Sequence, residues 1–147
     1  KRGAAGELRG KIDFDMRLGC LSTNCQYGMY GQFSSLPSFC SRLIDVAQPD
    51  DVVPGNAEIY CTLPDAETQS YKVEIVKASY QKSCREKGLV VRITDERLLN
   101  VTGGIVQGMS GSPIVQNGKL VGAVTHVFVN DPTRGYGIYA KWMVEQR

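Results

Sequence analysis

Residues 103–129 read Gly-Gly-Ile-Val-Gln-Gly-Met-Ser-Gly-Ser-Pro-Ile-Val-Gln-Asn-Gly-Lys-Leu-Val-Gly-Ala-Val-Thr-His-Val-Phe-Val. At the centre of this stretch, Ser110 lies between Gly108 and Gly111. Because glycine adopts backbone conformations that other residues avoid, we expect a tight, exposed turn at the serine. Asn117-Gly118, between two apolar runs, predicts that a β-hairpin follows. The stretch therefore predicts a serine at the mouth of a rigid hairpin, which suits a nucleophile.

Two interpretations of this serine follow from the local pattern alone. The predicted turn would direct the backbone N–H groups of Gly108 and Ser110 into one concavity, where they would form an oxyanion hole. Serines between glycines also occur in ordinary β-turns, where the hydroxyl only binds its own backbone. The motif Gly108-Met109-Ser110-Gly111 alone does not decide between a nucleophile and a structural turn.

The longer sequence resembles a known family. Gly-x-Ser-Gly-x-Pro followed by a short hairpin resembles the nucleophile region of chymotrypsin-like (trypsin-fold) serine proteases. Residues 101–142 closely resemble one branch, the SpoIVB peptidase family of regulatory serine proteases of bacterial endospore formation, and a looser match extends back to about Gly6. The resemblance implies that Ser110 is the nucleophile of a serine endopeptidase. An α/β-hydrolase esterase does not fit, because its Gly-x-Ser-x-Gly turn leads into a helix.

Length and composition bound the fold and exclude some functions. The 147 residues are enough for one domain and too few for two. The hydrophobic content of 42% and charged content of 22% are ordinary for a globular protein. The net charge of +2 comes from basic and acidic residues mixed along the chain, so nucleic acid is not an expected partner. No apolar run approaches the ~20 residues of a membrane-spanning helix.

Short β-prone segments separated by glycine turns indicate a β-sandwich or barrel. With the resemblance, we expect an all-β, trypsin-like fold of antiparallel β-barrels, the first incomplete, with a short C-terminal helix near Trp142. We expect one peptidase-type domain over residues 1–147, with a seam between sub-barrels near residues 48–56. The start at Lys1 suggests a processed form or a piece that lacks an upstream segment. Aromatic side chains are expected to fill a barrel interior at Tyr27, Tyr30 and Phe33. Besides the serine hairpin, the expected strands are 8–14, 17–25, 27–33, 58–62, 71–79, 88–94 and 135–140.

The chain contains an odd number of cysteines, so at least one is free or pairs outside the chain. They lack the spacing and the nearby histidines of a zinc site, and no metal or other cofactor is expected. We expect buried thiols that behave as small apolar side chains, with one disulfide among the first three as an open alternative. The five are Cys20, Cys25, Cys40, Cys61 and Cys84.

A serine hydroxyl needs a base, which is usually a histidine oriented by a carboxylate. The resemblance places this histidine upstream of Lys1, so the chain as given is expected to be inactive or nearly so. It also places an aspartate important for activity at Asp95, where we expect it to orient the histidine; the alternative is that Asp95 only caps the turn at Glu96-Arg97. The single histidine, His126, is expected to line the pocket for the residue before the scissile bond, together with Thr125 and Val127. There its imidazole would select glutamine or glutamate. The alternative is a strand histidine bound to a neighbouring carbonyl.

The resemblance also implies a biological setting. The substrate would be a membrane-associated regulatory protein whose cleavage triggers a sporulation signalling cascade. The parent protein would carry a membrane anchor and a PDZ-type module, and it would act outside the cytoplasm, between the forespore and mother-cell membranes. The competing interpretation is a non-catalytic β-barrel module that binds an extended peptide by strand addition.

Overall fold

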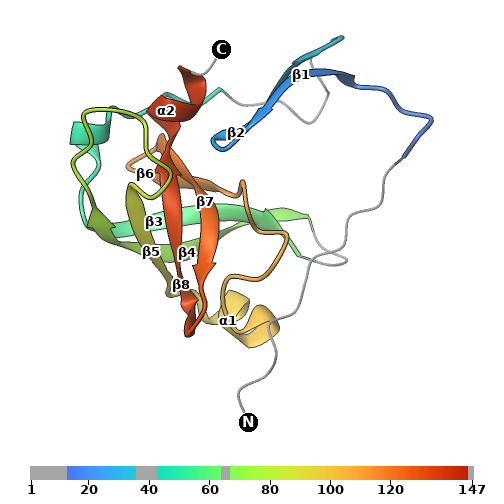
Figure 1. The fold of residues 1–147 in the computed structure, drawn as a ribbon. Helices are drawn as coiled ribbons and strands as arrows, with labels where there is room; N and C mark the ends of the chain where they lie inside the picture. Colours follow the sequence, from blue (N-terminus) through green and yellow to red (C-terminus); the bar gives the residue numbers. More distant parts are fainter. Residues whose placement is uncertain (1–12, 36–42, 64–66, 146–147) are drawn as a thin grey trace.

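The computed structural model describes residues 13–35, 43–63 and 67–145, which form a closed six-stranded antiparallel barrel and a separate two-stranded sheet (Figure 1). This confirms the expected fold class. One trypsin-like barrel is closed, and the other strands of the described chain form only a hairpin. A short helix, α2 (Ala140–Val144), follows the last strand. Around the barrel the strand order is β3-β4-β5-β8-β7-β6. The bounds are β3 (Gly55–Thr62), β4 (Thr68–Ala78), β5 (Leu89–Ile93), β6 (Pro113–Gln116), β7 (Lys119–Phe128) and β8 (Asp131–Tyr139).

Alternation of apolar and polar residues builds the barrel wall, as β4 illustrates. Tyr71, Val73 and Ile75 are buried, whereas Lys72 and Lys77 between and beyond them face water. Successive strand residues point to opposite faces, so this sequence pattern leaves one register that buries the apolar set. Each buried side chain of this size stabilises the fold by about 1.5–3 kcal/mol.

Two hairpins join the strands next to the serine. Asn117 and Gly118 have φ values of 51° and 76°, the two positive angles of the type I′ turn predicted between β6 and β7. The second hairpin corrects the sequence prediction, which placed the last strand at residues 135–140. Phe128 pairs with Asp131, so the turn contains only two residues and β8 begins at Asp131. Pairing of Asp131 with Phe128 on β7 starts the strand four residues before the predicted Gly135.

The first two strands, β1 (Gly19–Cys25) and β2 (Gly28–Phe33), form an antiparallel hairpin that lies beside the barrel (Figure 1). The expectation that its aromatic residues fill a barrel interior was wrong. Phe33 is 56% exposed and Tyr27 and Tyr30 are half-buried, because the hairpin belongs to no closed barrel of the described chain. The strand expected at residues 8–14 lies outside the described residues except for Asp13 and Phe14, which precede β1 and are not in a strand.

Residues 48–56 connect the hairpin side of the molecule to the barrel. They contain a short 3-10 helix, η1 (Pro49–Asp51), buried Val52 and the first residues of β3. The buried amide of Gln116 on β6 accepts a hydrogen bond from the Val53 N–H (3.2 Å) and donates to the carbonyls of Val53 (3.0 Å) and Asn56 (3.2 Å). This side chain therefore fixes the segment onto the barrel; a sub-barrel seam there stays a prediction.

The cysteines only partly follow the prediction of buried thiols. Cys61 is buried in the barrel, as predicted, but Cys20 and Cys25 are exposed on β1 and Cys84 is half-buried. The prediction was wrong for β1 because the hairpin has no core of its own. Cys40 lies outside the described residues. Of the helices described, none has the length and apolar character required to cross a membrane.

Candidate active site

The loop that carries Ser110 is fixed to the barrel at its base. It follows helix α1 (Glu96–Thr102), which ends at Gly103 in the left-handed conformation with φ 72°. The Ile105 N–H then donates to the Pro132 carbonyl at the start of β8 (2.7 Å). Ile105, Val106 and Met109 are all at most 5% exposed, so alternate parts of the loop pack into the core. Such anchoring is what holds a reacting group in one place.

The second anchor lies on the other side of the serine. The Gly111 N–H donates to the Val124 carbonyl (2.8 Å), and the Val124 N–H donates to the Ser112 carbonyl (2.9 Å). Gly111 has a φ of 91°, a conformation that favours glycine. Ser110 itself is exposed at the crest of the loop, between buried Met109 and buried Ser112. The tight, exposed turn predicted from the sequence is therefore confirmed.

The hydroxyl of Ser110 is held by β7. Its Oγ donates a hydrogen bond to the carbonyl of Thr125 at 2.9 Å. This contact joins two of the predicted site residues directly. It also means that the hydroxyl proton rests on a carbonyl, which is a weak acceptor compared with an imidazole and cannot take the proton as a base does.

The amides proposed for the oxyanion hole lie on this same loop. The neighbouring amides are occupied, since the Met109 N–H donates to Val106 (3.1 Å) and the Ser112 N–H to Met109 (3.0 Å). By contrast, the N–H groups of Gly108 and Ser110 donate to no atom of the described residues. Gly108 adopts a φ of 98° that few other residues tolerate, and this angle sets the direction of the peptide groups around it. The use of these two donors in an oxyanion hole stays a prediction.

Beyond Thr125, β7 continues past the serine loop with two exposed residues, His126 and Val127. The Thr125 hydroxyl donates to the Tyr136 carbonyl (3.2 Å), and the strand has a register shift between Val124 and His126. The imidazole of His126 makes no hydrogen bond to Ser110, or to any carbonyl of the part of the chain that is described. The structure thus places the predicted pocket strand against Ser110, and the pocket role itself stays a prediction.

Asp95 caps helix α1, as its position before Glu96 allows. One carboxylate oxygen, Oδ1, accepts from the N–H of Arg97 (3.0 Å) and from its Nε (3.0 Å). The other, Oδ2, accepts from the Lys72 N–H (3.1 Å) and from Arg97 Nη2 (2.8 Å). The capping alternative is confirmed. Within the described residues no hydrogen bond or ion pair joins Asp95 to Ser110 or His126.

The electrostatics of Asp95 follow from these four bonds. Hydrogen bonds from the Arg97 side chain hold the pKa of the Asp95 carboxyl well below its usual range, and the Lys72 and Arg97 amides act in the same direction. Burial opposes them, since Asp95 is 5% exposed, but it is outweighed. The carboxylate of Asp95 therefore keeps its charge to lower pH than an ordinary aspartate. Its role as the orienter of a histidine stays a prediction.

Two features of the site were not found from the sequence. The Thr125 carbonyl as partner of Ser110 could not be inferred, because backbone contacts between distant segments leave no residue signature. The hydrogen bond from the Lys72 N–H to Asp95, which links β4 to the α1 cap, also joins segments too far apart in the chain to be inferred. Among the described residues no group of three His, Cys, Asp or Glu side chains is placed to hold a metal ion.

Comparisons with known proteins agree with this geometry. The family model described as SpoIVB peptidase S55 matches residues 1–144. No curated protein sequence matches the chain.

Two solved structures share the fold. One is the Rv3671c protease from Mycobacterium tuberculosis in its active form, with a TM-score of 0.61 and 16% sequence identity over 87% of this chain and 56% of that chain. The other is a serine-to-alanine mutant of Rv3671c from M. tuberculosis H37Rv in an inactive form, with a TM-score of 0.55 and 16% identity over 80% of this chain and 56% of that chain. The chain thus spans little more than half of the structures that it matches.

Proposed function

Because the chain belongs to the SpoIVB peptidase family, we propose that it is the nucleophile-bearing part of a serine endopeptidase, with Ser110 as the nucleophile. One observation carries the proposal. Ser110 is an exposed hydroxyl on a loop anchored from both sides, and the amides of Gly108 and Ser110 beside it bind no described acceptor. An ordinary structural turn would not need this combination.

The proposed chemistry is acyl transfer. Ser110 Oγ leaves the Thr125 carbonyl and attacks the carbonyl carbon of the scissile peptide, while a histidine upstream of this sequence takes its proton. The oxyanion that develops accepts hydrogen bonds from Gly108 and Ser110, each worth about 2.7–4 kcal/mol of transition-state stabilisation. Asp95 is the proposed orienter of that histidine, a role that has to be reconciled with its four bonds at the α1 cap. These 147 residues alone are proposed to be inactive.

A fluorophosphonate probe tests this assignment, because it reacts only with an activated serine. We expect labelling of a longer protein that includes the upstream histidine, and none of the 147-residue chain. Ser110→Ala should abolish labelling, whereas the matched control Ser112→Ala, two residues away in the same loop, should retain it. Labelling of the short chain would make His126 the leading base. If neither protein is labelled, the alternative of a non-catalytic peptide-binding module takes the lead.

The substrate preference is proposed to lie with Thr125, His126 and Val127. The support is that the Thr125 carbonyl contacts the nucleophile, so the next two residues pass beside the scissile bond. Peptides that differ only at the residue before that bond should be cleaved fastest with glutamine or glutamate. His126→Ala should remove the preference, and Val129→Ala, at an exposed position just beyond β7, should keep it. Equal cleavage of all peptides by the unaltered enzyme would refute the pocket role.

The family membership supports a wider proposal. The parent protein cleaves a membrane-associated regulator in the space between the forespore and mother-cell membranes, and a membrane anchor and a PDZ-type module outside these residues bring it to its substrate. Cleavage of that regulator starts a sporulation signalling cascade through an intramembrane protease. In sporulating cells, Ser110→Ala in the parent protein should block maturation of the regulator. Normal maturation in that variant would exclude this role while leaving the peptidase chemistry open.

A further inference from the structure

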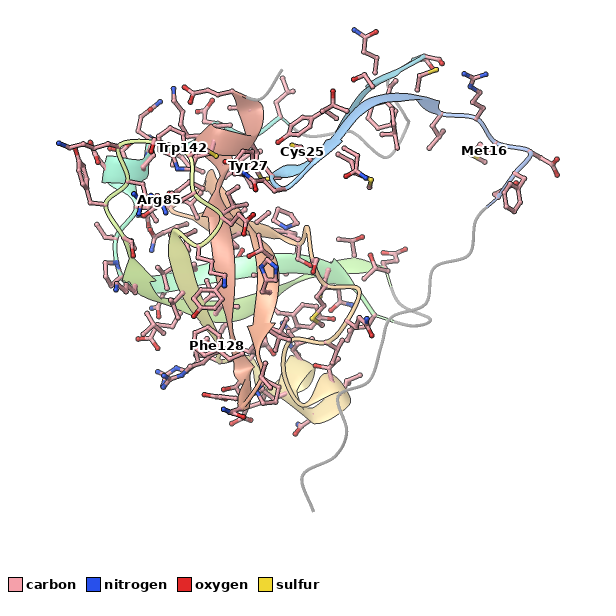
Figure 2. All side chains as sticks on the ribbon, viewed as in Figure 1. Met16, Cys25, Tyr27, Arg85, Phe128 and Trp142 are labelled. Atoms are coloured by element: carbon pink, nitrogen blue, oxygen red, sulfur yellow. The ribbon has the colours of Figure 1, made fainter. Side chains whose placement is uncertain are left out.

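The outer face of the barrel carries a half-buried tyrosine, Tyr136 on β8. A Cβ atom built on the next residue, Gly137, would lie 2.9 Å from the buried side chain of Ile114, so position 137 faces the core. Successive strand residues point to opposite faces, so the Tyr136 side chain lies on the outside of the barrel. The ring of Phe128 supports it there, with the two ring centroids 4.6 Å apart. Figure 2 shows Phe128 near the β7–β8 turn, at the end of the barrel away from Trp142.

A lysine covers the ring of this tyrosine. The ammonium of Lys87, in the segment before β5, lies 4.8 Å from the centroid of the Tyr136 ring. Attraction between a cation and an aromatic face holds the flexible lysine stem over β8. Lys87 is exposed and forms no ion pair with any residue that the structure describes. Its charge is therefore open to an anion from outside the chain.

The imidazole of His126 belongs to the same face. His126 pairs with Tyr136 across β7 and β8, so the two side chains point to the outside of the barrel with their Cβ atoms about 5 Å apart. His126 directly follows Thr125, whose carbonyl accepts the hydrogen bond from the Ser110 hydroxyl at 2.9 Å. The imidazole of His126 and the ammonium of Lys87 are therefore both neighbours of the tyrosine side chain, one residue along β7 from the contact with the proposed nucleophile.

The charges on the neighbouring strands are balanced in pairs. Glu74 forms an ion pair with Arg92 across β4 and β5, and Asp131 forms one with Arg134 at 3.2 Å. Arg134 lies two residues before the tyrosine on β8, so it points to the same outer face, and it is opposite Arg92 on β5. Lys87 adds a third cation to these two pairs, so an acidic group that approaches the tyrosine ring meets an excess of positive charge.

The edge of β7 beside these residues is open to a peptide. Strand β6 pairs with β7 only as far as Ala123, and from His126 to Phe128 the strand pairs with β8 alone in the part of the chain that is described. An extended peptide can add to such an edge through backbone hydrogen bonds, and its alternate side chains then lie on the outer face. A side chain of a peptide bound there would reach His126 first and the lysine over the tyrosine ring next.

We propose that Lys87 makes this face selective for an acidic residue of the bound peptide, so that glutamate is preferred to glutamine at the position that contacts His126. The inference rests on the proposed function, which brings a peptide substrate along β7 to Ser110. An imidazole N–H can donate to the side-chain oxygen of either residue, so His126 alone does not separate them. The ammonium of Lys87 attracts only the charged one, and it supplies the difference in affinity on which specificity depends.

Binding of short peptides to the 147-residue chain tests this inference without requiring catalysis. Fluorescein-labelled, alanine-based peptides carry a single glutamate or a single glutamine, which is moved along the peptide, and fluorescence anisotropy gives the Kd of each. At one position we expect the glutamate peptide to bind about threefold more tightly than its glutamine counterpart, as for an exposed ion pair. Added salt should reduce this ratio, because it screens exposed charges.

Variants of the lysine identify the source of the preference. Lys87→Met should remove the difference between the glutamate and glutamine peptides, whereas Lys87→Arg, which keeps the charge, should retain it. The matched control is Lys82→Met, which removes an exposed lysine of the same connecting segment and should retain the difference as well. Equal affinities in the unaltered chain would overturn the inference, as would a preference that persists in Lys87→Met or disappears in Lys82→Met. Absence of binding of every peptide would also overturn it.

The fluorophosphonate labelling of the longer protein separates this inference from the proposed function. Labelling together with equal peptide affinities would refute the acidic preference and leave the peptidase assignment in place. A glutamate preference that depends on Lys87, in the absence of labelling, would support the acidic preference within a peptide-binding module and refute the proposed catalysis.

Discussion

Replacement of Asp95 separates its structural contribution from a catalytic one. In Asp95→Ala, helix α1 loses its N-cap, which costs about 1 kcal/mol. The Lys72 N–H loses its acceptor, and an unsatisfied donor of this kind costs about 2 kcal/mol. The ion pair with Arg97 adds little, because the Arg97 side chain is 61% exposed and solvent screens it. We therefore expect a loss of about 3 kcal/mol in the free energy of unfolding.

The pH dependence gives this prediction its signature. The pKa of Asp95 is lowered in the folded protein, chiefly by the Arg97 side chain, whereas an unfolded aspartate titrates at about 3.9. As pH falls below that value, the unfolded chain binds a proton that the folded protein does not, so the stabilisation is lost. The difference between the unaltered chain and Asp95→Ala should be complete above about pH 5 and should shrink steadily below pH 4.

Urea unfolding at pH 7 and pH 3 measures this difference, with the fluorescence of Trp142, the single tryptophan, and circular dichroism as two probes. Asp50→Ala, which removes an exposed aspartate, is the control and should change stability by less than about 0.5 kcal/mol. A stability of Asp95→Ala equal to that of the unaltered chain at pH 7 would refute the reasoning. In the longer protein that is proposed to be active, Asp95→Asn keeps an acceptor at the cap, so loss of probe labelling there without unfolding would support the orienting role.

Three further changes test how the serine loop and its surroundings are held. Gly104 has a φ of 146°, and in Gly104→Ala the new Cβ would lie 2.3 Å from the Pro132 carbonyl oxygen. We therefore expect thermal unfolding to show a loss of more than about 3 kcal/mol in the free energy of unfolding. An unchanged unfolding temperature would contradict the close packing of the loop against β8. Gly118→Ala has open space around it, so only the positive φ of 76° is strained, and a milder loss of about 1 kcal/mol is expected by the same measurement. Tyr139→Phe removes the hydrogen bond from the buried Tyr139 hydroxyl to the Ser79 carbonyl (3.0 Å). Urea unfolding should then show a loss of about 1 kcal/mol in the free energy of unfolding. An unchanged free energy would show that this bond contributes nothing to stability.

Local patterns were sufficient for much of the fold. The alternation of Tyr71, Val73 and Ile75 and the Asn117-Gly118 turn each specify their structure within a few residues, and both predictions are confirmed. Predictions failed where contacts between elements decide. The start of β8 at Asp131 depends on its pairing with Phe128 on β7, and the exposure of Phe33 depends on the hairpin lying outside the barrel.

The site was predictable to a different degree at each residue. The turn at Ser110 follows from its glycines, and the cap at Asp95 follows from an aspartate before a helix, because both depend on neighbours in the chain. The acceptor for the Ser110 hydroxyl is a backbone carbonyl fifteen residues away, and any residue at position 125 other than Thr would offer the same group. The sequence therefore identifies the side chain that carries the chemistry more readily than it identifies the contacts that position this side chain.

The bond between Ser110 and Thr125 sets a condition on catalysis. The hydroxyl donates its single proton to a carbonyl at 2.9 Å, and a base must draw that proton away before attack. The loop does not need to move for this exchange, because its amides at Met109, Gly111 and Ser112 keep their own partners. Rotation of one side-chain bond is enough to redirect the oxygen. The loop therefore already holds the proposed nucleophile in place, and the proposed mechanism needs a base that competes with the Thr125 carbonyl.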